Sequence, residues 1–129
     1  MTIEERAEQA VAYKHKACNC CQAVLFALKD QTGLDDAQLL AMASGFGSGM
    51  GSMEGSCGAL VGAAMAAGLR LNGSGTSRAA RQMSLAFKDA CGAVTCRELK
   101  GVRTGRVLCA CDDCVRNAVR IYGKLMGLD

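Results

Sequence analysis

The chain has 129 residues, half of them hydrophobic, a length that suits one compact domain spanning residues 1–129. Only five residues are aromatic and none is tryptophan, so the core must be built from alanine, leucine, valine, methionine and cysteine. The formal net charge of +3 favours no class of partner, and the basic stretch Arg97–Arg106 lacks the interleaved aromatic residues of a nucleic-acid surface. Nucleic-acid binding is therefore not expected.

The ends and the apolar segments of the sequence bear on its location. The first residues, Met1–Arg6, are charged and are followed by no apolar signal segment. The longest apolar stretch, Cys57–Leu69, is too short to cross a bilayer. We therefore expect a cytoplasmic protein without membrane insertion. Because thiols are kept reduced in the cytoplasm, nine cysteines indicate metal or redox chemistry rather than a disulfide framework.

The first part of the chain predicts two helices before a glycine-rich loop. Apolar residues recur at helical spacing over Ile3–Lys29, which predicts one long helix. Asp35 is followed three residues later by Gln38, a variant of the capping box, which predicts the start of a short helix. That helix is expected to end where the glycine-rich segment Gly45–Gly55 begins.

The segment Gly58–Leu71 predicts a central helix rich in small residues. Gly58 and Gly62 share one face of it, which lets a neighbouring helix pack close to its backbone. A turn at Asn72–Gly75 follows. Helices with such faces also suit a homodimer.

Two further helices and a short turn complete the prediction. Thr76 or Ser77 is expected to cap a helix that ends at Cys91, Thr95 to cap a short turn, and Cys111–Met126 to form the last helix. The residues expected to face inward on these two helices are Ala79, Met83, Ala86, Phe87, Ala90, Val115, Ala118, Val119, Tyr122 and Leu125. The fold class is all-α: a bundle-like domain of roughly five helices, with the glycine-rich loop preceding the central helix.

Cys57 is the cysteine with the most informative position, since it joins the glycine-rich loop to the central helix. A helix N-terminus carries unpaired N–H groups and a positive dipole end, which favour a thiolate. Cys57 is therefore a candidate nucleophile or metal ligand. Gly51, Gly55 and Gly58 would let backbone amides approach the sulfur atoms of a bound cofactor.

The other cysteines form groups that lie far apart in the sequence. The pairs Cys18/Cys21 and Cys111/Cys114 have C-x-x-C spacing, but they lie on predicted helices near opposite ends of the chain. A zinc ribbon, which uses two such pairs on turns, is therefore poorly matched. A thioredoxin-like site is also disfavoured, because no strand precedes Cys111 and two carboxylates follow it. Cys18 and Cys91 are interpreted as small buried residues.

Several segments together resemble a known family. The segments are Asn19–Leu25, Gly45–Gly51, Cys57–Gly62, Cys96–Leu99 and Cys114–Val115. In this order they resemble the putative redox-active proteins named for their C, GCAxxG, C and C motif. The resemblance implies that Cys21, Cys57, Cys96 and Cys114 are the catalytic or metal-ligating cysteines. A related module is similar to the iron–sulfur-bearing part of split-Soret cytochromes, which implies an iron–sulfur cluster.

Three functions remain as hypotheses. The first is a redox or electron-transfer protein that has a four-cysteine metal centre, most plausibly iron–sulfur with zinc as the alternative, and that acts with a redox partner protein. The second is a metal-free thiol–disulfide oxidoreductase or redox sensor, in which Cys57 attacks and another cysteine resolves. The third is a non-redox helical module that binds a partner or a small ligand through Met42, Met50 and Met53.

Several residues near these sites have no assigned role in the chemistry. Five cysteines lie outside the four-cysteine pattern, namely Cys18, Cys20, Cys91, Cys109 and Cys111. They would extend the site, act as resolving thiols or fill the core. His15 and Glu54 are interpreted as solvated, with an extra ligand and a proton relay as their alternative roles. The glycine-rich loop does not match a phosphate-binding motif.

Overall fold

The computed structural model describes all residues 1–129 and contains helices but no β-strand. The elements are α1 (Ile3–Lys16), α2 (Cys20–Ala27), η1 (Lys29–Gln31), α3 (Asp36–Ala43), η2 (Gly49–Met53), α4 (Gly58–Leu71), α5 (Thr76–Cys91), α6 (Cys96–Lys100) and α7 (Cys111–Met126). The all-α prediction is confirmed. The number of α-helices exceeds five because the first predicted helix is two helices and because the short turn at Cys96 is a helix of its own.

The break between α1 and α2 corrects the prediction of one helix over Ile3–Lys29. Ala17 leaves the helical region with φ −156°, and Asn19 caps α2. The Asn19 side chain accepts a hydrogen bond from the Gln22 N–H at 2.8 Å, and the Gln22 side chain accepts one from the Asn19 N–H at 2.9 Å. This reciprocal capping box satisfies two N–H groups and starts a new helix without proline or glycine. As a result, Cys20 is the first residue of α2.

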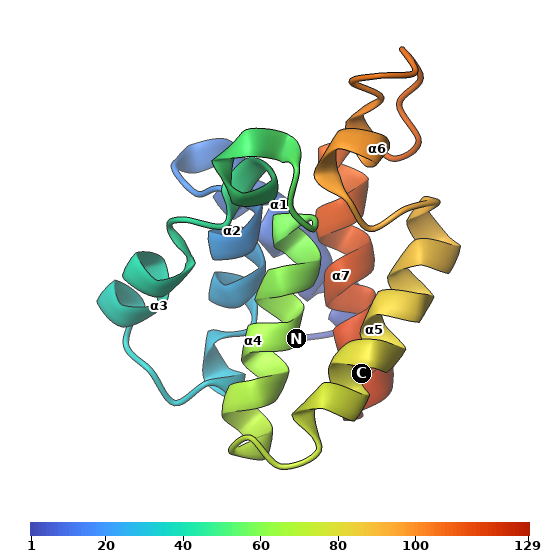
Figure 1. The fold of residues 1–129 in the computed structure, drawn as a ribbon. Helices are drawn as coiled ribbons and strands as arrows, with labels where there is room; N and C mark the ends of the chain where they lie inside the picture. The colour runs from blue at the N-terminus through green and yellow to red at the C-terminus, as the bar shows by residue number, and fades with distance from the viewer.

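The central helix α4 has the predicted bounds and packs against α2, α5 and α7 (Figure 1). Its glycine face meets α2 closely. A Cβ atom on Gly62 would lie 2.8 Å from the Cys21 carbonyl oxygen, and one on Gly58 would lie 2.6 Å from the Cys20 sulfur. The predicted close approach of a neighbouring helix is therefore confirmed. It holds the first turn of α4 against the first turn of α2.

The inner faces of α5 and α7 follow the prediction except at their last turns. Met83, Phe87 and Tyr122 are fully buried. Ala90 and Leu125 are predicted to face inward but are exposed, because each lies at the edge of the buried face of its helix; Cys91, one residue beyond Ala90, is buried. No helix of this chain combines the length and the apolarity needed to span a membrane.

Of two predicted helix caps, the structure confirms one and corrects the other. Asp35 and Gln38 form the expected capping box of α3, with the Asp35 carboxylate accepting from the Gln38 N–H at 2.8 Å. At α5 the prediction was wrong, because Gly75 occupies the cap position with φ 73° and offers no side chain. The hydroxyl of Thr76 is buried there without a hydrogen-bond partner. Glycine adopts this left-handed backbone without strain, so the chain reverses at Gly75 rather than one residue later.

An ion pair ties α1 to the end of α2. Arg6 donates to both carboxylate oxygens of Asp30, at 2.6 and 2.9 Å, and to the Ala27 carbonyl oxygen at 3.2 Å. The hydrogen bonds from Arg6 lower the pKa of Asp30 to about 2. A carboxyl whose pKa is lower in the folded state stabilises the fold above its unfolded pKa, and that contribution is lost as the pH falls toward 2.

We therefore expect Asp30→Asn to lower the free energy of unfolding at neutral pH by less than about 1 kcal/mol, because Asp30 is half exposed and screened by solvent. The difference from the wild-type chain should shrink as the pH falls from about 4 to about 2. Urea unfolding at several pH values measures it. A difference that stays constant down to pH 2 would contradict the assigned role of Asp30.

Candidate functional site

One cavity gathers most of the cysteines of the chain. It has a volume of about 180 Å³ and lies where the α1–α2 junction, the first turn of α4, α6 and the start of α7 meet. Seven of its thirteen lining residues are cysteines, namely Cys18, Cys20, Cys57, Cys96, Cys109, Cys111 and Cys114. Groups far apart in the sequence therefore share one site by tertiary packing.

Four of these cysteines lie at the N-termini of four different helices. Cys20, Cys96 and Cys111 are the first residues of α2, α6 and α7, and Cys57 is the residue that precedes α4. The N-termini of α2, α4 and α7 thus point their unpaired N–H groups and positive dipole ends toward the cavity. Such an environment stabilises thiolates over thiols.

A short backbone bridge holds Cys57 and Cys96 on the same side of the molecule. The Cys57 N–H donates to the Val94 carbonyl oxygen at 2.7 Å, and the Cys96 N–H donates to the Gly55 carbonyl oxygen at 3.0 Å. Gly49, at φ 57°, allows this contact, because a Cβ atom there would lie 2.6 Å from the Cβ atom of Cys96. The glycine-rich turn is therefore shaped to pack against α6.

The three glycines predicted to bind a cofactor occupy different places. Gly58 lines the cavity. Gly55 is half-buried and contributes through its carbonyl oxygen, which holds the Cys96 amide. Gly51 is exposed on the turn, and a Cβ atom there would meet nothing within 4 Å. Of the three glycines, only Gly58 therefore borders the cavity directly.

The Cys57 thiol lies at the centre of the cysteine contacts. Hydrogen bonds with the thiols of Cys114 and Cys20, and with the amides of Ala59 and Leu60, hold the pKa of Cys57 well below its usual range. The neighbouring Cys20 thiol and burial raise the pKa of Cys111 above its usual range. The sulfurs of Cys111, Cys20, Cys57 and Cys114 therefore form a continuous series of neighbours.

The structure separates the cysteines implied by the family resemblance. Cys57, Cys96 and Cys114 line the cavity, whereas Cys21 is fully buried in the core and does not. Successive residues of a helix point about 100° apart, so Cys20 faces the cavity while Cys21 faces the core. Burial raises the pKa of the Cys21 thiol to about 12.

The sequence gives Cys20 and Cys111 no single role, since extending the site is one of three alternatives for them. The signal for Cys20 was the capping box formed by Asn19 and Gln22, which marks Cys20 as a first helical residue. Cys111 is predicted to start the last helix, just as Cys57 is predicted to precede the central one. This shared position at the start of a helix is the signal for Cys111.

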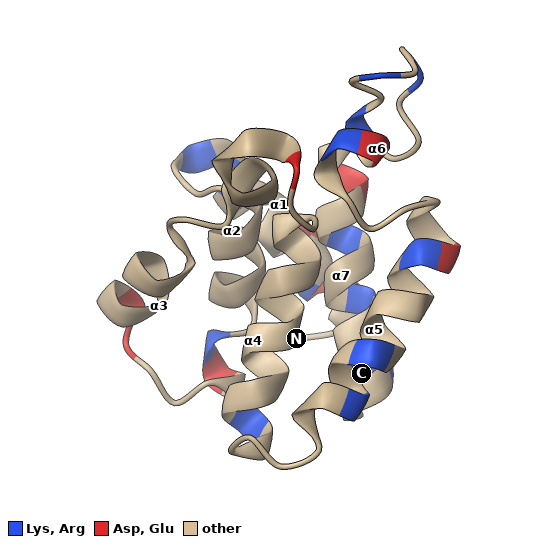
Figure 2. Cartoon of the chain, viewed as in Figure 1, with Lys and Arg blue, Asp and Glu red and all other residues tan.

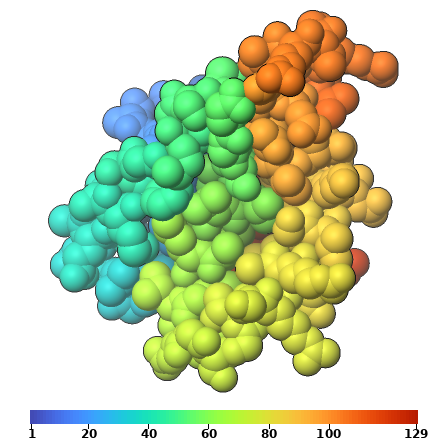
Figure 3. Space-filling view, in the orientation of Figure 1, coloured from blue at the N-terminus to red at the C-terminus, as the bar shows by residue number.

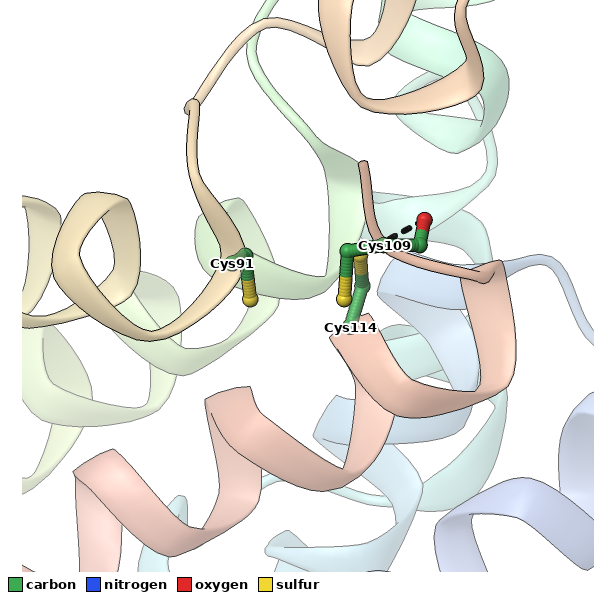
Figure 4. Close-up of side chains that lie close together, drawn as sticks. All are labelled: Cys91, Cys109 and Cys114. Carbon is green, nitrogen blue, oxygen red and sulfur yellow. Dashed lines mark hydrogen bonds between the residues drawn. The ribbon is translucent and has the colours of Figure 1, made fainter. Parts of the chain in front are cut away.

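Cys91, Cys109 and Cys114 form a compact second group next to Cys57 (Figure 4). Their sulfur atoms all lie within 4.8 Å of one another. Cys91 comes from the end of α5, Cys109 from the segment before α7, and Cys114 from the first turn of α7. Cys91, interpreted from the sequence as a small core residue, is buried and lies in this thiol group.

Charged residues border the cavity. Lys14 and Lys100 line it, and Lys14 is bound to Asp112 at 2.7 Å. His15, predicted to be solvated, is 61% exposed and also pairs with Asp112, at 2.8 Å. Glu54 is exposed and pairs with Arg97 at 2.7 Å. The two lysines therefore supply positive charge beside the thiols.

Segment 101–110 projects beyond the body of the molecule beside the cavity (Figure 3). It connects α6 to α7 and follows the basic residues of α6, as Figure 2 shows. Arg103, Arg106 and Val107 are exposed on it. The segment returns to the body where the Leu108 N–H donates to the Leu99 carbonyl oxygen at 2.9 Å.

Comparison with known proteins gives one match. A family model described as "Putative redox-active protein (C_GCAxxG_C_C)" matches residues 18–125. No curated protein and no solved structure matches the chain. The matched residues include all nine cysteines and every residue that lines the cavity except Lys14.

Proposed function

Since the chain belongs to the family of putative redox-active proteins with the C, GCAxxG, C and C motif, we propose that it is an electron-transfer protein whose cysteine-lined cavity holds an iron–sulfur cluster. The observation that carries the proposal is that each of four helices has a cysteine at its N-terminus, as cap or first residue, and that all four cysteines line one cavity. These cysteines are Cys20, Cys57, Cys96 and Cys111. Four thiolates are the usual ligands of such clusters.

The donor set fits a cluster in its chemistry and surroundings. Cys20, Cys57 and Cys96 are at least nine-tenths buried, and a buried charge is costly unless it is compensated. Compensation is available from the N-termini of three helices and from Lys14 and Lys100. A cluster places metal and sulfide ions between its thiolates, so its ligands need not touch one another.

The proposed ligands differ at two positions from those implied by the family resemblance. Cys57 and Cys96 are common to both sets. We assign Cys20 in place of Cys21, because Cys20 lines the cavity and Cys21 does not. We assign Cys111 in place of Cys114, because Cys111 neighbours Cys20, whereas Cys114 lies within the group that contains Cys91 and Cys109.

A bound cluster would accept and release one electron at a time. The chain would set the reduction potential, since hydrogen bonds from the Ala59 and Leu60 amides to Cys57 stabilise negative charge on sulfur. Cys111 is the most exposed of the four proposed ligands and would lie nearest the surface. The partner is proposed to be another protein, approaching beside the projecting segment 101–110.

Adjacent cysteines provide a matched test of this assignment. After anaerobic purification, the wild-type chain is expected to contain iron and sulfide and to absorb visible light. Cys20→Ala is expected to lose all three signals, whereas Cys21→Ala keeps them, although both residues are buried and adjacent. A colourless, iron-free wild-type protein would contradict the function. Loss in Cys21→Ala with retention in Cys20→Ala would contradict the ligand assignment.

A metal-free thiol–disulfide oxidoreductase is the second candidate, favoured by the contact of Cys57 with Cys114 and Cys20. The Cys57 thiolate would attack a substrate disulfide, forming a mixed disulfide and releasing one substrate thiolate. The Cys114 thiol would then attack the Cys57 sulfur, forming a Cys57–Cys114 disulfide and releasing the second substrate thiol, which takes the proton that Cys114 loses. The substrate disulfide is thereby reduced and the two cysteines oxidised.

This second function makes a prediction about pH. Because its pKa is lowered, Cys57 in the reduced, metal-free protein should remain a thiolate at pH values where ordinary thiols are protonated. Its alkylation rate, followed by mass mapping, should therefore change little between about pH 6 and about pH 8. Both pH values lie below the pKa of an ordinary thiol, which is about 8.5. A rate for Cys57 that rises about tenfold per pH unit, as for an ordinary thiol, would contradict it.

A further inference from the structure

The group formed by Cys91, Cys109 and Cys114 is left unused by the proposed cluster. We propose that these three thiols form a second metal site, which takes one soft d¹⁰ cation of the Zn²⁺ class. The site shares no cysteine with the proposed cluster, whose ligands are Cys20, Cys57, Cys96 and Cys111. Soft thiolate donors select such cations over magnesium or calcium.

The spacing of the sulfur atoms fits one ion. Zinc–sulfur bonds are about 2.3 Å long, so thiolates bound to a single zinc ion lie roughly 3.8–4.0 Å apart. The three sulfur atoms already lie within 4.8 Å of one another (Figure 4). Small side-chain rotations therefore close the site, without movement of α5 or α7.

The surroundings support a metal over a disulfide. An odd number of thiols leaves one unpaired after any disulfide forms within the group, whereas one ion takes all three. Asn117, one turn after Cys114 on α7, donates its side-chain N–H to the Cys91 sulfur at 3.3 Å. Such a hydrogen bond orients a ligand and stabilises its thiolate.

The cavity provides a way in and a fourth coordination position. Cys91 and Cys114 are 4% and 2% exposed, but Cys109 and Cys114 line the cavity. An ion could therefore enter from the cavity and keep one position open toward it. Three protein ligands with an open position are the arrangement of exchangeable or catalytic zinc sites rather than closed structural ones.

The test uses the full-length chain with Cys20→Ser and Cys96→Ser, so that cluster assembly is disabled and the two proposals fail separately. This protein, reduced and metal-free, is titrated with Cd²⁺, and thiolate-to-metal charge-transfer absorption is recorded. Zn²⁺ affinity is measured by competition with a chromophoric chelator. One equivalent should bind. Adding Cys91→Ser or Cys109→Ser should abolish binding, whereas Cys18→Ser, the control at another cavity cysteine, should leave it unchanged.

Two measurements guard against a variant that merely unfolds. Asn117→Ala keeps all three thiols and should weaken Zn²⁺ binding by roughly 10- to 100-fold, while circular dichroism shows the helices intact. X-ray absorption at the zinc edge should give three sulfur ligands at about 2.3 Å and one lighter ligand. The proposal is overturned if Cys91→Ser binds as before, if Asn117→Ala has no effect, or if nitrogen and oxygen ligands predominate.

Discussion

Replacing Gly58 with alanine is expected to prevent binding of the proposed cluster and to lower the free energy of unfolding by about 1–3 kcal/mol. A Cβ atom at this position would lie 2.5 Å from the Phe46 carbonyl oxygen and 2.6 Å from the Cys20 sulfur. Both distances are shorter than any normal contact, and the first involves backbone that cannot rotate away. The first turns of α2 and α4 must therefore separate, which displaces Cys20 relative to Cys57.

Gly68→Ala is the matched control for this prediction. Gly68 lies on the same helix, and its Cβ atom would meet only the Thr76 methyl group at 3.4 Å, an ordinary contact. Alanine is favoured over glycine inside a helix by up to about 1 kcal/mol, so Gly68→Ala should be neutral or stabilising. Iron content and urea unfolding of the two variants provide the measurements. Equal iron content in both would contradict the role given to Gly58.

The second large effect is expected at Phe87, where alanine should lower the free energy of unfolding by about 3–5 kcal/mol. Phe87 is fully buried on α5, in a core assembled mostly from alanine and other small side chains. Small neighbours cannot collapse far into the space that a phenylalanine leaves. The loss is a large fraction of the roughly 5–15 kcal/mol that stabilises a typical domain.

Leu85→Ala, on the exposed side of the same helix, is the control. Leu85 is 54% exposed, so its truncation should change the free energy of unfolding by no more than about 0.5 kcal/mol. Both variants are measured by urea unfolding of the reduced, metal-free chain, followed by circular dichroism. A loss below about 1 kcal/mol for Phe87→Ala would show that the core around α5 repacks, contrary to the structure described.

The sequence predicts the long helices of this fold well, because their ends carry local signals. The bounds of α4 follow from its periodic apolar residues between the glycine-rich loop and the Asn72–Gly75 turn, and α7 ends where Gly127 follows its apolar residues. The break at Ala17 was missed because apolar spacing continues through it, so that only the Asn19–Gln22 capping box marks it. Periodicity, in other words, reports which face is buried but not where one helix gives way to another.

The candidate site is harder to predict, since it lies at the ends of helices rather than on their core faces. Helical spacing selects Cys21 as inward-facing, and it is inward-facing, but toward the core and not toward the cavity. The grouping of Cys91 with Cys109 and Cys114 depends on how the end of α5 meets the start of α7. No local pattern encodes that relative placement.

Two backbone hydrogen bonds bear on how a cofactor would enter the cavity. One joins Cys57 to Val94, and the other joins Cys96 to Gly55. Cys20 and Cys57 belong to helices buried in the core, whereas Cys96 lies on a five-residue helix that this pair of hydrogen bonds fastens to the glycine-rich turn. The buried Leu99 side chain and a hydrogen bond from the Leu108 N–H to the Leu99 carbonyl oxygen, at 2.9 Å, also hold α6 in place. We therefore expect insertion of the proposed cluster to require local opening of this five-residue helix rather than unfolding of the bundle.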